Sequence, residues 1–204
     1  MYSNPNGGYT TRAFEVYERV AQFGINVYAW DYPGYKLSTG TPTYASVMEA
    51  GEAVLRFVAA HSIKRPEDVI LLGRSLGGAV SIALAQRFRS KALVLLNPLD
   101  SLQSLLGDCC VLSGWASGLH YANGHFDAKN SLAEFGGCLF HYAAEDDVIV
   151  YYRRQRKLFF EYSENKNKEC SVFVKGKCMG HNDDQWELDS FVKAMNVYLT
   201  GLDI

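Results

Sequence analysis

Several features that mark other protein classes are scarce in this sequence of 204 residues. Its 20 Lys and Arg nearly balance 22 Asp and Glu, a formal net charge of −2, so we expect no basic surface and no nucleic-acid partner. No apolar run approaches the ~18 residues that a membrane-spanning helix needs. Residues 1–20 lack the continuous apolar stretch of a secretory signal.

Cysteine is also scarce and irregularly placed. The sequence holds five cysteines, whereas a disulfide framework in a small secreted chain favours an even count. We therefore expect reduced thiols and a cytoplasmic location. No Cys-x-x-Cys motif and no pair of histidines at helical ligand spacing occurs, so we expect neither a metal site nor a cofactor. The cysteines are Cys109, Cys110, Cys138, Cys170 and Cys178.

The chain does contain a regular alternation of apolar segments. Hydrophobic residues make up 48% and charged residues 21%, which is typical of a globular protein, and the length fits one domain over residues 1–204. Short apolar runs predict strands, and segments with apolar residues three or four apart predict helices. The expected strands are residues 25–30, 68–73, 92–96, 138–142 and 171–174, and the expected helices are residues 43–61, 76–89, 151–162 and 184–199.

This alternation predicts an α/β fold. Strands separated by helices pair in parallel through right-handed crossovers, so we expect an open, mostly parallel sheet with helices on both faces. Residues 99–136 have no clear period, and we interpret about 101–130 as a small cap-like excursion from the domain. The buried stripe of the helix over residues 43–61 is expected at Val47, Ala50, Val54, Phe57 and His61.

A nucleophile motif follows the second expected strand. Residues 73–77 (Gly-Arg-Ser-Leu-Gly) fit the pattern G-x-S-x-G between a strand and a helix. The glycines let the two segments approach around a strained turn, and the helix N-terminus favours developing negative charge near the hydroxyl. The pattern predicts Ser75 as a nucleophile. The alternative is a tight turn that merely contains a serine.

A serine hydroxyl needs a base to remove its proton. His181 lies between the last expected strand and the last helix, at the carboxyl edge of the sheet where active residues gather. We therefore predict His181 as the general base, with a solvated loop histidine as the alternative. His61 and His141 are expected to be packing residues, and His120 and His125 lie in the excursion without an anchoring element.

The imidazole in turn needs a carboxylate that fixes its tautomer. Glu145, Asp146 and Asp147 follow the fourth expected strand, at the same edge of the sheet. From the residues alone any of the three fits this role, and a solvated acidic loop is the alternative. The order Ser, Asp, His along the chain is the order found in hydrolases with the G-x-S-x-G turn.

These residues resemble the serine hydrolases of the α/β-hydrolase fold, and most closely the small-capped branch of membrane-linked protein depalmitoylases and related esterases. In that family the acid precedes a Val-Ile pair by two positions, which selects Asp146. Counting from His141 as the family's strand-end histidine selects Glu145 instead. The resemblance covers nearly the whole chain and rests on residues 31–35, 38–40, 65–70, 73–77, 97–99, 126–127, 145–149 and 180–183.

The resemblance implies acyl transfer to water through a covalent acyl-enzyme on Ser75, with His181 oriented by Asp146. It also implies an oxyanion hole made by the amide of Leu76 and that of Asn4, since the next residue, Pro5, has no N–H. The implied partner is an acyl ester or thioester substrate, an acylated protein included. The acyl-chain length, the leaving-group atom and the oligomeric state stay open.

Two departures accompany the resemblance. Lys36 stands where the family has a second glycine, which changes a surface turn. The chain also begins inside the oxyanion loop, so residues 25–30 would be the family's fourth strand and we expect the three strands before it to be missing. Loss of the mid-sheet third strand predicts either direct pairing of residues 25–30 with 69–72 or unpaired backbone groups, each costing about 1–3 kcal/mol when buried.

Two other functions stay open. The missing strand favours a non-catalytic or incomplete hydrolase-like protein, and the fold also supports a serine peptidase. The aromatic and aliphatic content of residues 101–126 instead favours a cap over an acyl pocket. The basic run over residues 153–157 fits either contact with an anionic membrane surface or, in our interpretation, the exposed face of an amphipathic helix.

Overall fold

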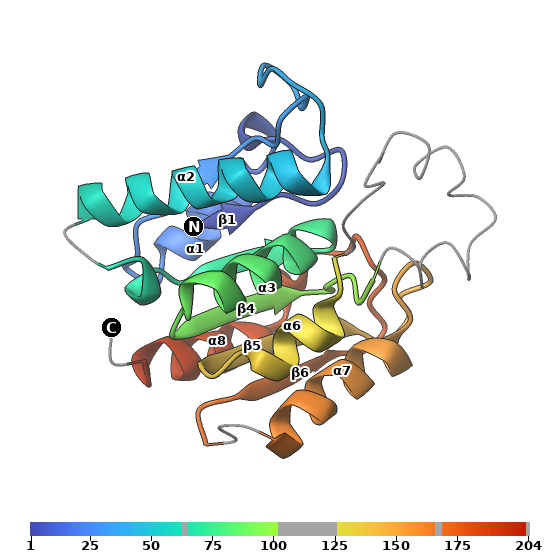
Figure 1. Cartoon of the computed structure of the whole chain (residues 1–204). Helices are drawn as coiled ribbons and strands as arrows, with labels where there is room; N and C mark the ends of the chain where they lie inside the picture. Colours follow the sequence, from blue (N-terminus) through green and yellow to red (C-terminus); the bar gives the residue numbers. More distant parts are fainter. Residues whose placement is uncertain (63–64, 102–125, 166–168, 203–204) are drawn as a thin grey trace.

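A computed structural model describes residues 1–62, 65–101, 126–165 and 169–202 of the chain (Figure 1). Its centre is a six-stranded sheet in the order β2-β1-β3-β4-β5-β6, with every neighbouring pair parallel. The strands are β1 (Tyr2–Ser3), β2 (Ala29–Trp30), β3 (Leu71–Arg74), β4 (Ala92–Leu96), β5 (Cys138–Ala144) and β6 (Val172–Gly176). The described helices are α1 (Phe14–Ala21), α2 (Tyr44–Ser62), α3 (Leu76–Phe88), α6 (Ala128–Glu134), α7 (Tyr152–Asn165) and α8 (Asp189–Thr200), with short 3-10 helices η1 (Thr10–Arg12), η2 (Pro66–Asp68) and η4 (Gln185–Glu187).

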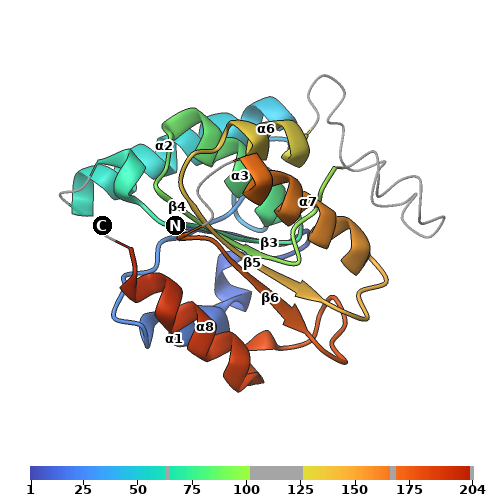
Figure 2. The same ribbon diagram turned by 90° about the horizontal axis from the view of Figure 1, so that it is seen from below.

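Helices cover both faces of the sheet, which confirms the predicted fold class. Figure 2 shows α2, α3, α6 and α7 on one face and α1 and α8 on the other. The central strands are apolar throughout because each face packs into its own core. Leu71, Leu93 and Leu139 belong to the core under α2 and α3, whereas Val94 and Phe140 face the core under α8.

The strand register brings the ends of the central strands to one edge of the sheet. Arg74 at the end of β3 pairs with Leu96, and Leu96 pairs with Tyr142 of β5. Further along, Ala144 pairs with Gly176 at the end of β6. The loops that follow these four strands therefore begin side by side.

The prediction of a missing mid-sheet strand is wrong, because the first residues of the chain lie between β2 and β3. Tyr2 pairs with Ala29 on one side and with Leu72 on the other. The Tyr2 amide donates to Tyr28 O at 2.8 Å, and the Leu72 amide donates to the Met1 carbonyl at 2.9 Å. The predicted strand over residues 25–30 shortens to β2 for the same reason, since the β1 ladder is only two residues long.

The predicted buried stripe of α2 is also wrong in part. Phe57 is 56% exposed and His61 is exposed, with the two rings stacked at 3.8 Å between centroids. The helix instead turns its glycine toward α3, where a Cβ at Gly51 would lie 2.9 Å from Leu84 Cδ1. This close approach selects the side that is buried, namely Val47, Met48, Gly51, Leu55, Val58 and Ala59.

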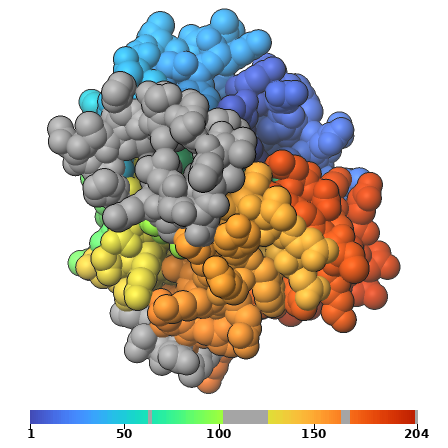
Figure 3. Space-filling model, turned by 90° about the vertical axis from the view of Figure 1, so that its right-hand side faces the viewer, coloured from blue at the N-terminus to red at the C-terminus, as the bar shows by residue number. Residues whose placement is uncertain are grey.

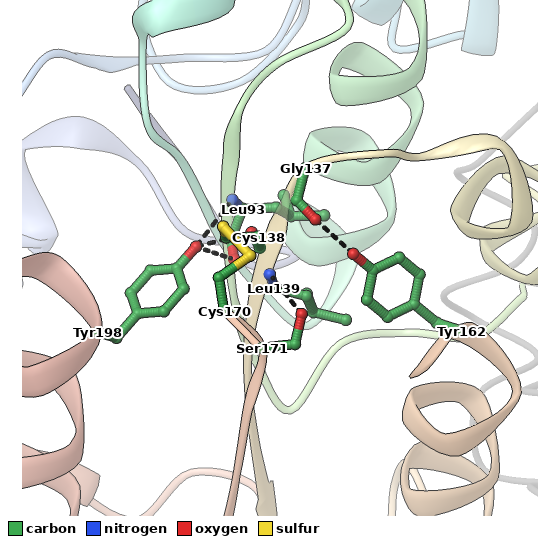
Figure 4. Close-up of a disulfide and its surroundings, with 8 residues drawn as sticks. All are labelled: Leu93, Gly137, Cys138, Leu139, Tyr162, Cys170, Ser171 and Tyr198. Carbon is green, nitrogen blue, oxygen red and sulfur yellow. Dashed lines mark hydrogen bonds between the residues drawn. A yellow bond between two sulfur atoms is a disulfide. The ribbon is translucent and has the colours of Figure 1, made fainter. Parts of the chain in front are cut away.

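Reduced thiols were predicted, but Cys138 and Cys170 form a disulfide with a Cα–Cα distance of 5.2 Å (Figure 4). The bond joins the first residue of β5 to the turn before β6, so strand pairing brings together two cysteines that are 32 residues apart. On one side the Tyr198 hydroxyl donates to Cys138 O at 2.7 Å. Cys178 is a free, exposed thiol, and Cys109 and Cys110 lie outside the described residues.

Most of the predicted cap-like excursion lies outside the described residues, which resume at residue 126. Ser101 and Asp127 form an antiparallel bridge at its base. Asp127 caps α6, because its Oδ1 accepts from the Asn130 amide at 3.1 Å. Among the helices in the described ranges, none is both long and apolar enough to cross a membrane.

Candidate active site

The turn between β3 and α3 has the strand-turn-helix geometry that the G-x-S-x-G motif predicts. Ser75 adopts a φ of 53°, a left-handed conformation that a non-glycine residue rarely takes. Side-chain-free neighbours make the turn possible, because a Cβ at Gly73 would lie 2.0 Å from Gly77 O, and one at Gly77 would lie 2.0 Å from Ser3 O. The Ser75 amide donates to Leu96 O at 3.0 Å, which ties the turn to β4.

His181 meets this serine from the loop after β6. Its Nε2 lies 3.0 Å from Ser75 Oγ, across 106 positions of sequence, and the residue is 7% exposed. The backbone of the loop is clamped, because the His181 carbonyl accepts from Arg74 Nη2 at 3.0 Å and from Asn97 Nδ2 at 3.1 Å. Asn97 also accepts from the Ala144 amide at 2.8 Å, so one buried side chain links β4, β5 and the histidine loop.

Asp147, and not the predicted Asp146, contacts the imidazole. Asp147 Oδ2 lies 2.7 Å from His181 Nδ1, and its Oδ1 accepts from the amides of Ile149 and Val150, both at 2.8 Å. Asp147 is 3% exposed, whereas Asp146 is exposed, and its backbone amide donates to Met179 O at 2.9 Å. The third candidate, Glu145, pairs with Lys175 away from the imidazole.

The error of one residue has a physical reason. Three apolar residues in a row, positions 148–150, contain two overlapping apolar pairs, and the prediction counted back from the first. Val148 is 73% exposed while Val150 is 2% exposed, so the second pair enters the core and sets the register. Counting two positions back from Ile149 gives Asp147.

The hydrogen-bond partners assign the proton positions. An ionised carboxylate only accepts, so Nδ1 of His181 carries the ring proton toward Asp147. Nε2 is then an acceptor that faces the hydroxyl of Ser75. The arrangement is a base poised on a nucleophile and oriented by a buried acid.

The two predicted oxyanion residues lie next to each other across the turn. Leu76 is the first residue of α3, where backbone N–H groups have no intrahelical partner. A Cβ at Gly77 would lie 2.6 Å from Asn4 O, which places the Asn4 backbone against the residue that follows Leu76. Asn4 is 1% exposed, its Nδ2 donates to Trp30 O at 2.9 Å, and its carbonyl accepts from the Tyr32 hydroxyl at 2.6 Å.

The other histidines do not reach this site within the described structure. His141 is fully buried in β5 between the rings of Phe159 and Phe173, as its predicted packing role requires. His61 is at the surface of α2, and His120 and His125 lie outside the described residues. In the described ranges, no three side chains of His, Cys, Asp or Glu are grouped to hold a metal ion.

Sequence reasoning missed the residues that support the site. Asn97 was visible only as part of the Asn-Pro pair that ends β4, and Arg74 only as a variable position of the motif. Gln155, which contacts Asp147 from α7, has no signal in the sequence except a polar residue at an apolar position of the helical period.

A parallel sheet flanked by helices, with a serine turn after one strand and its base and acid after two others, defines the α/β hydrolases. Solved structures share this fold over most of the chain. An esterase from Pyrococcus furiosus matches with a TM-score of 0.75 and 14% identity over 98% of this chain and 81% of that one. A monoacylglycerol lipase from Paleococcus ferrophilus matches with a TM-score of 0.67 and 18% identity over 97% and 92%.

The chain belongs to the hydrolase family described as serine aminopeptidase, S33, whose model matches residues 6–131. Human alpha/beta hydrolase domain-containing protein 17B is 36% identical over 81 residues, 40% of this chain and 28% of that protein. An uncharacterized membrane protein of Saccharomyces cerevisiae is 27% identical over 186 residues, 87% of this chain and 61% of that protein. The chain thus spans between 28% and 61% of these two relatives.

Proposed function

We propose that this protein is a serine hydrolase that cleaves carboxylic esters or thioesters through Ser75, His181 and Asp147. The observation that carries the proposal is the continuous hydrogen-bonded path from Ser75 Oγ to His181 Nε2 at 3.0 Å and from His181 Nδ1 to Asp147 Oδ2 at 2.7 Å. Both partner residues are buried, so the path is shielded from competing water.

In the proposed reaction, Ser75 Oγ attacks the acyl carbonyl while His181 Nε2 takes the hydroxyl proton. Asp147 stabilises the resulting imidazolium. The amides of Leu76 and Asn4 donate to the oxyanion of the tetrahedral intermediate. The imidazolium then protonates the leaving alcohol or thiol, which leaves an acyl-enzyme that water hydrolyses by the same steps in reverse.

An acyl ester or thioester is favoured over a peptide by the structural neighbours, which include an esterase and a monoacylglycerol lipase. The narrower proposal, removal of an acyl group from a protein, is supported by the sequence resemblance to the depalmitoylase branch. A serine peptidase is the second candidate, because the family is described as serine aminopeptidase.

Covalent labelling with a fluorophosphonate probe tests the nucleophile. We expect the chain to be labelled, Ser75→Ala to abolish labelling, and Ser190→Ala, on the exposed surface of α8, to leave it unchanged. Circular dichroism and a cooperative thermal transition show that each variant is folded. A folded wild-type chain that takes no label would overturn the proposal and favour a non-catalytic protein.

Hydrolysis of three substrates then distinguishes the activities. We expect turnover of p-nitrophenyl esters and of a palmitoylated peptide thioester to depend on Ser75, and no turnover of an aminoacyl p-nitroanilide. Ester cleavage without thioester cleavage would confine the function to an esterase. Faster cleavage of the anilide would favour the peptidase.

A further inference from the structure

Gln155 is a polar side chain at a core position of α7. The residue is fully buried and lies at helical spacing with the buried residues Leu158, Phe159 and Tyr162. A buried amide costs free energy unless it is hydrogen-bonded, so an apolar residue would be the simpler choice there. The contacts of the Gln155 amide explain the difference.

The hydrogen bonds of the Gln155 amide nitrogen lead to Asp147 and its loop. Gln155 Nε2 donates to Asp147 Oδ2 at 3.2 Å and to Val150 O at 2.7 Å. Oδ2 is the oxygen that also faces His181 Nδ1, while Val150 supplies one of the amides that bind Oδ1. One amide group therefore holds both the carboxylate and the loop whose backbone donates to it.

We infer that Gln155 is a positioning residue for the proposed hydrolysis, holding the Asp147 carboxylate in the plane of the His181 ring and limiting the negative charge on Oδ2. The inference rests on the proposed function. Two backbone donors on Oδ1 fix one oxygen, and Gln155 supplies a further donor to the other. A donor shared on Oδ2 weakens that oxygen as a partner for the imidazolium, and removal of the donor strengthens that pairing.

The buried neighbour of Gln155 on β5 carries no charge at neutral pH. This neighbour, His141, lies behind Gln155, fully buried, with its ring beside the Gln155 side chain. Burial lowers the pKa of His141 to about 3, although the neighbouring Gln155 opposes the shift, so this ring is neutral at neutral pH. Charged side chains near the site include Arg74, which donates to the His181 carbonyl, and the pair of Glu145 with Lys175, and substitution of Gln155 leaves them in place.

The test is the pH profile of fluorophosphonate labelling between pH 5 and 10 for wild type, Gln155→Met and Gln155→Leu. Both variants remove the donor and suit a core position. Gln86→Met, whose amide contacts Glu134 on the surface, is the matched control. We expect the acid limb to move up by about half to one pH unit in both Gln155 variants, which lowers labelling on that limb by about three- to ten-fold.

The shape of the profile separates positioning from general loosening. Recovery of labelling at alkaline pH, with a higher titration midpoint of the His181 imidazole by ¹⁵N NMR, is the expected result. An unmoved acid limb, with labelling unchanged or reduced equally at every pH, would overturn the inference. Because the wild-type chain is labelled in that case, such a result leaves the proposed function intact, whereas an unlabelled wild type overturns both.

Discussion

The turn that presents Ser75 and the turn that presents Asp147 are held by different forces. Around Ser75 the backbone itself is crowded, and a Cβ at Gly73 would lie 2.0 Å from Gly77 O. Around Asp147 no such crowding is needed, because the carboxylate accepts from two backbone amides and from Gln155. One turn is shaped by exclusion of atoms and the other by hydrogen bonds. Figure 3 shows the molecule from the right-hand side of Figure 1, the side toward which the strands of the sheet run.

The comparison implies that the two turns respond to different substitutions. A crowded turn tolerates polar changes but not an added methyl group. A hydrogen-bonded turn tolerates changes in volume at its exposed positions but not the loss of a donor or acceptor. Substitutions in the two turns should therefore differ in their effects on the free energy of unfolding and on labelling.

Among the variants that keep the Ser75 nucleophile, Asp147→Asn should have the largest effect on labelling. An amide at this position can donate to His181 Nδ1 and select the wrong tautomer, so Nε2 no longer accepts from Ser75. We expect labelling and ester hydrolysis to fall about 10³- to 10⁴-fold. The matched variant Asp146→Asn, at an exposed neighbouring carboxylate, should stay within about two-fold of wild type, since surface substitutions rarely matter. The opposite ranking would restore Asp146 as the acid.

Gly73→Ala should be strongly destabilising at the serine turn. The added Cβ would meet the backbone at Gly77, which cannot rotate away as a flexible side chain can. We expect a loss of about 4 kcal/mol or more in the free energy of unfolding. Gly136→Ala is the control, because its Cβ would meet no atom within 4 Å. Urea unfolding measures both, and equal stability of the two variants would contradict a sterically shaped turn.

The two turns also differ in how far sequence alone could predict them. Steric crowding selects glycine, and glycine is visible in a sequence, so the serine turn could be placed correctly. The end of β4 could be placed from the Asn-Pro pair at residues 97–98. Hydrogen bonds to backbone amides leave no residue pattern, so the acid was placed one residue early. Gln155 and the two-residue strand β1 were missed for the same reason, because each depends on neighbours far along the chain.

Removal of the disulfide tests whether a change at the start of β5 alters labelling at the site, which includes the Asp147 turn after the end of this strand. Cys138 is the first residue of β5 and the turn follows its last, so the bond lies at the opposite end of the strand from the site. Closing a loop with a sequence separation of 32 constrains the unfolded chain and so raises the free energy of unfolding by about 4 kcal/mol. We expect Cys138→Ala with Cys170→Ala to lose that amount in urea unfolding while labelling at 25 °C is unchanged.

Cys178→Ala, at the free and exposed thiol, is the matched control and should be neutral. Titration of thiols in the native protein gives an independent check. Detection of the Cys138 and Cys170 thiols without reductant would show that the bond does not form.

Mild acid should lower the free energy of unfolding because of His141, which is buried in β5. Burial lowers its pKa to about 3 from an ordinary 6.5, so the unfolded chain takes up the proton before the folded one does. The contribution of neutral His141 to the free energy of unfolding is therefore fully present above pH 6.5. It is lost as the pH falls toward 3, at up to about 1.4 kcal/mol per pH unit. His141→Leu removes this titration, so its unfolding free energy should vary less between pH 6.5 and 4 than that of wild type. His61→Leu, at an exposed ring on α2, should keep the wild-type slope, and equal slopes for the two variants would contradict a neutral, buried His141.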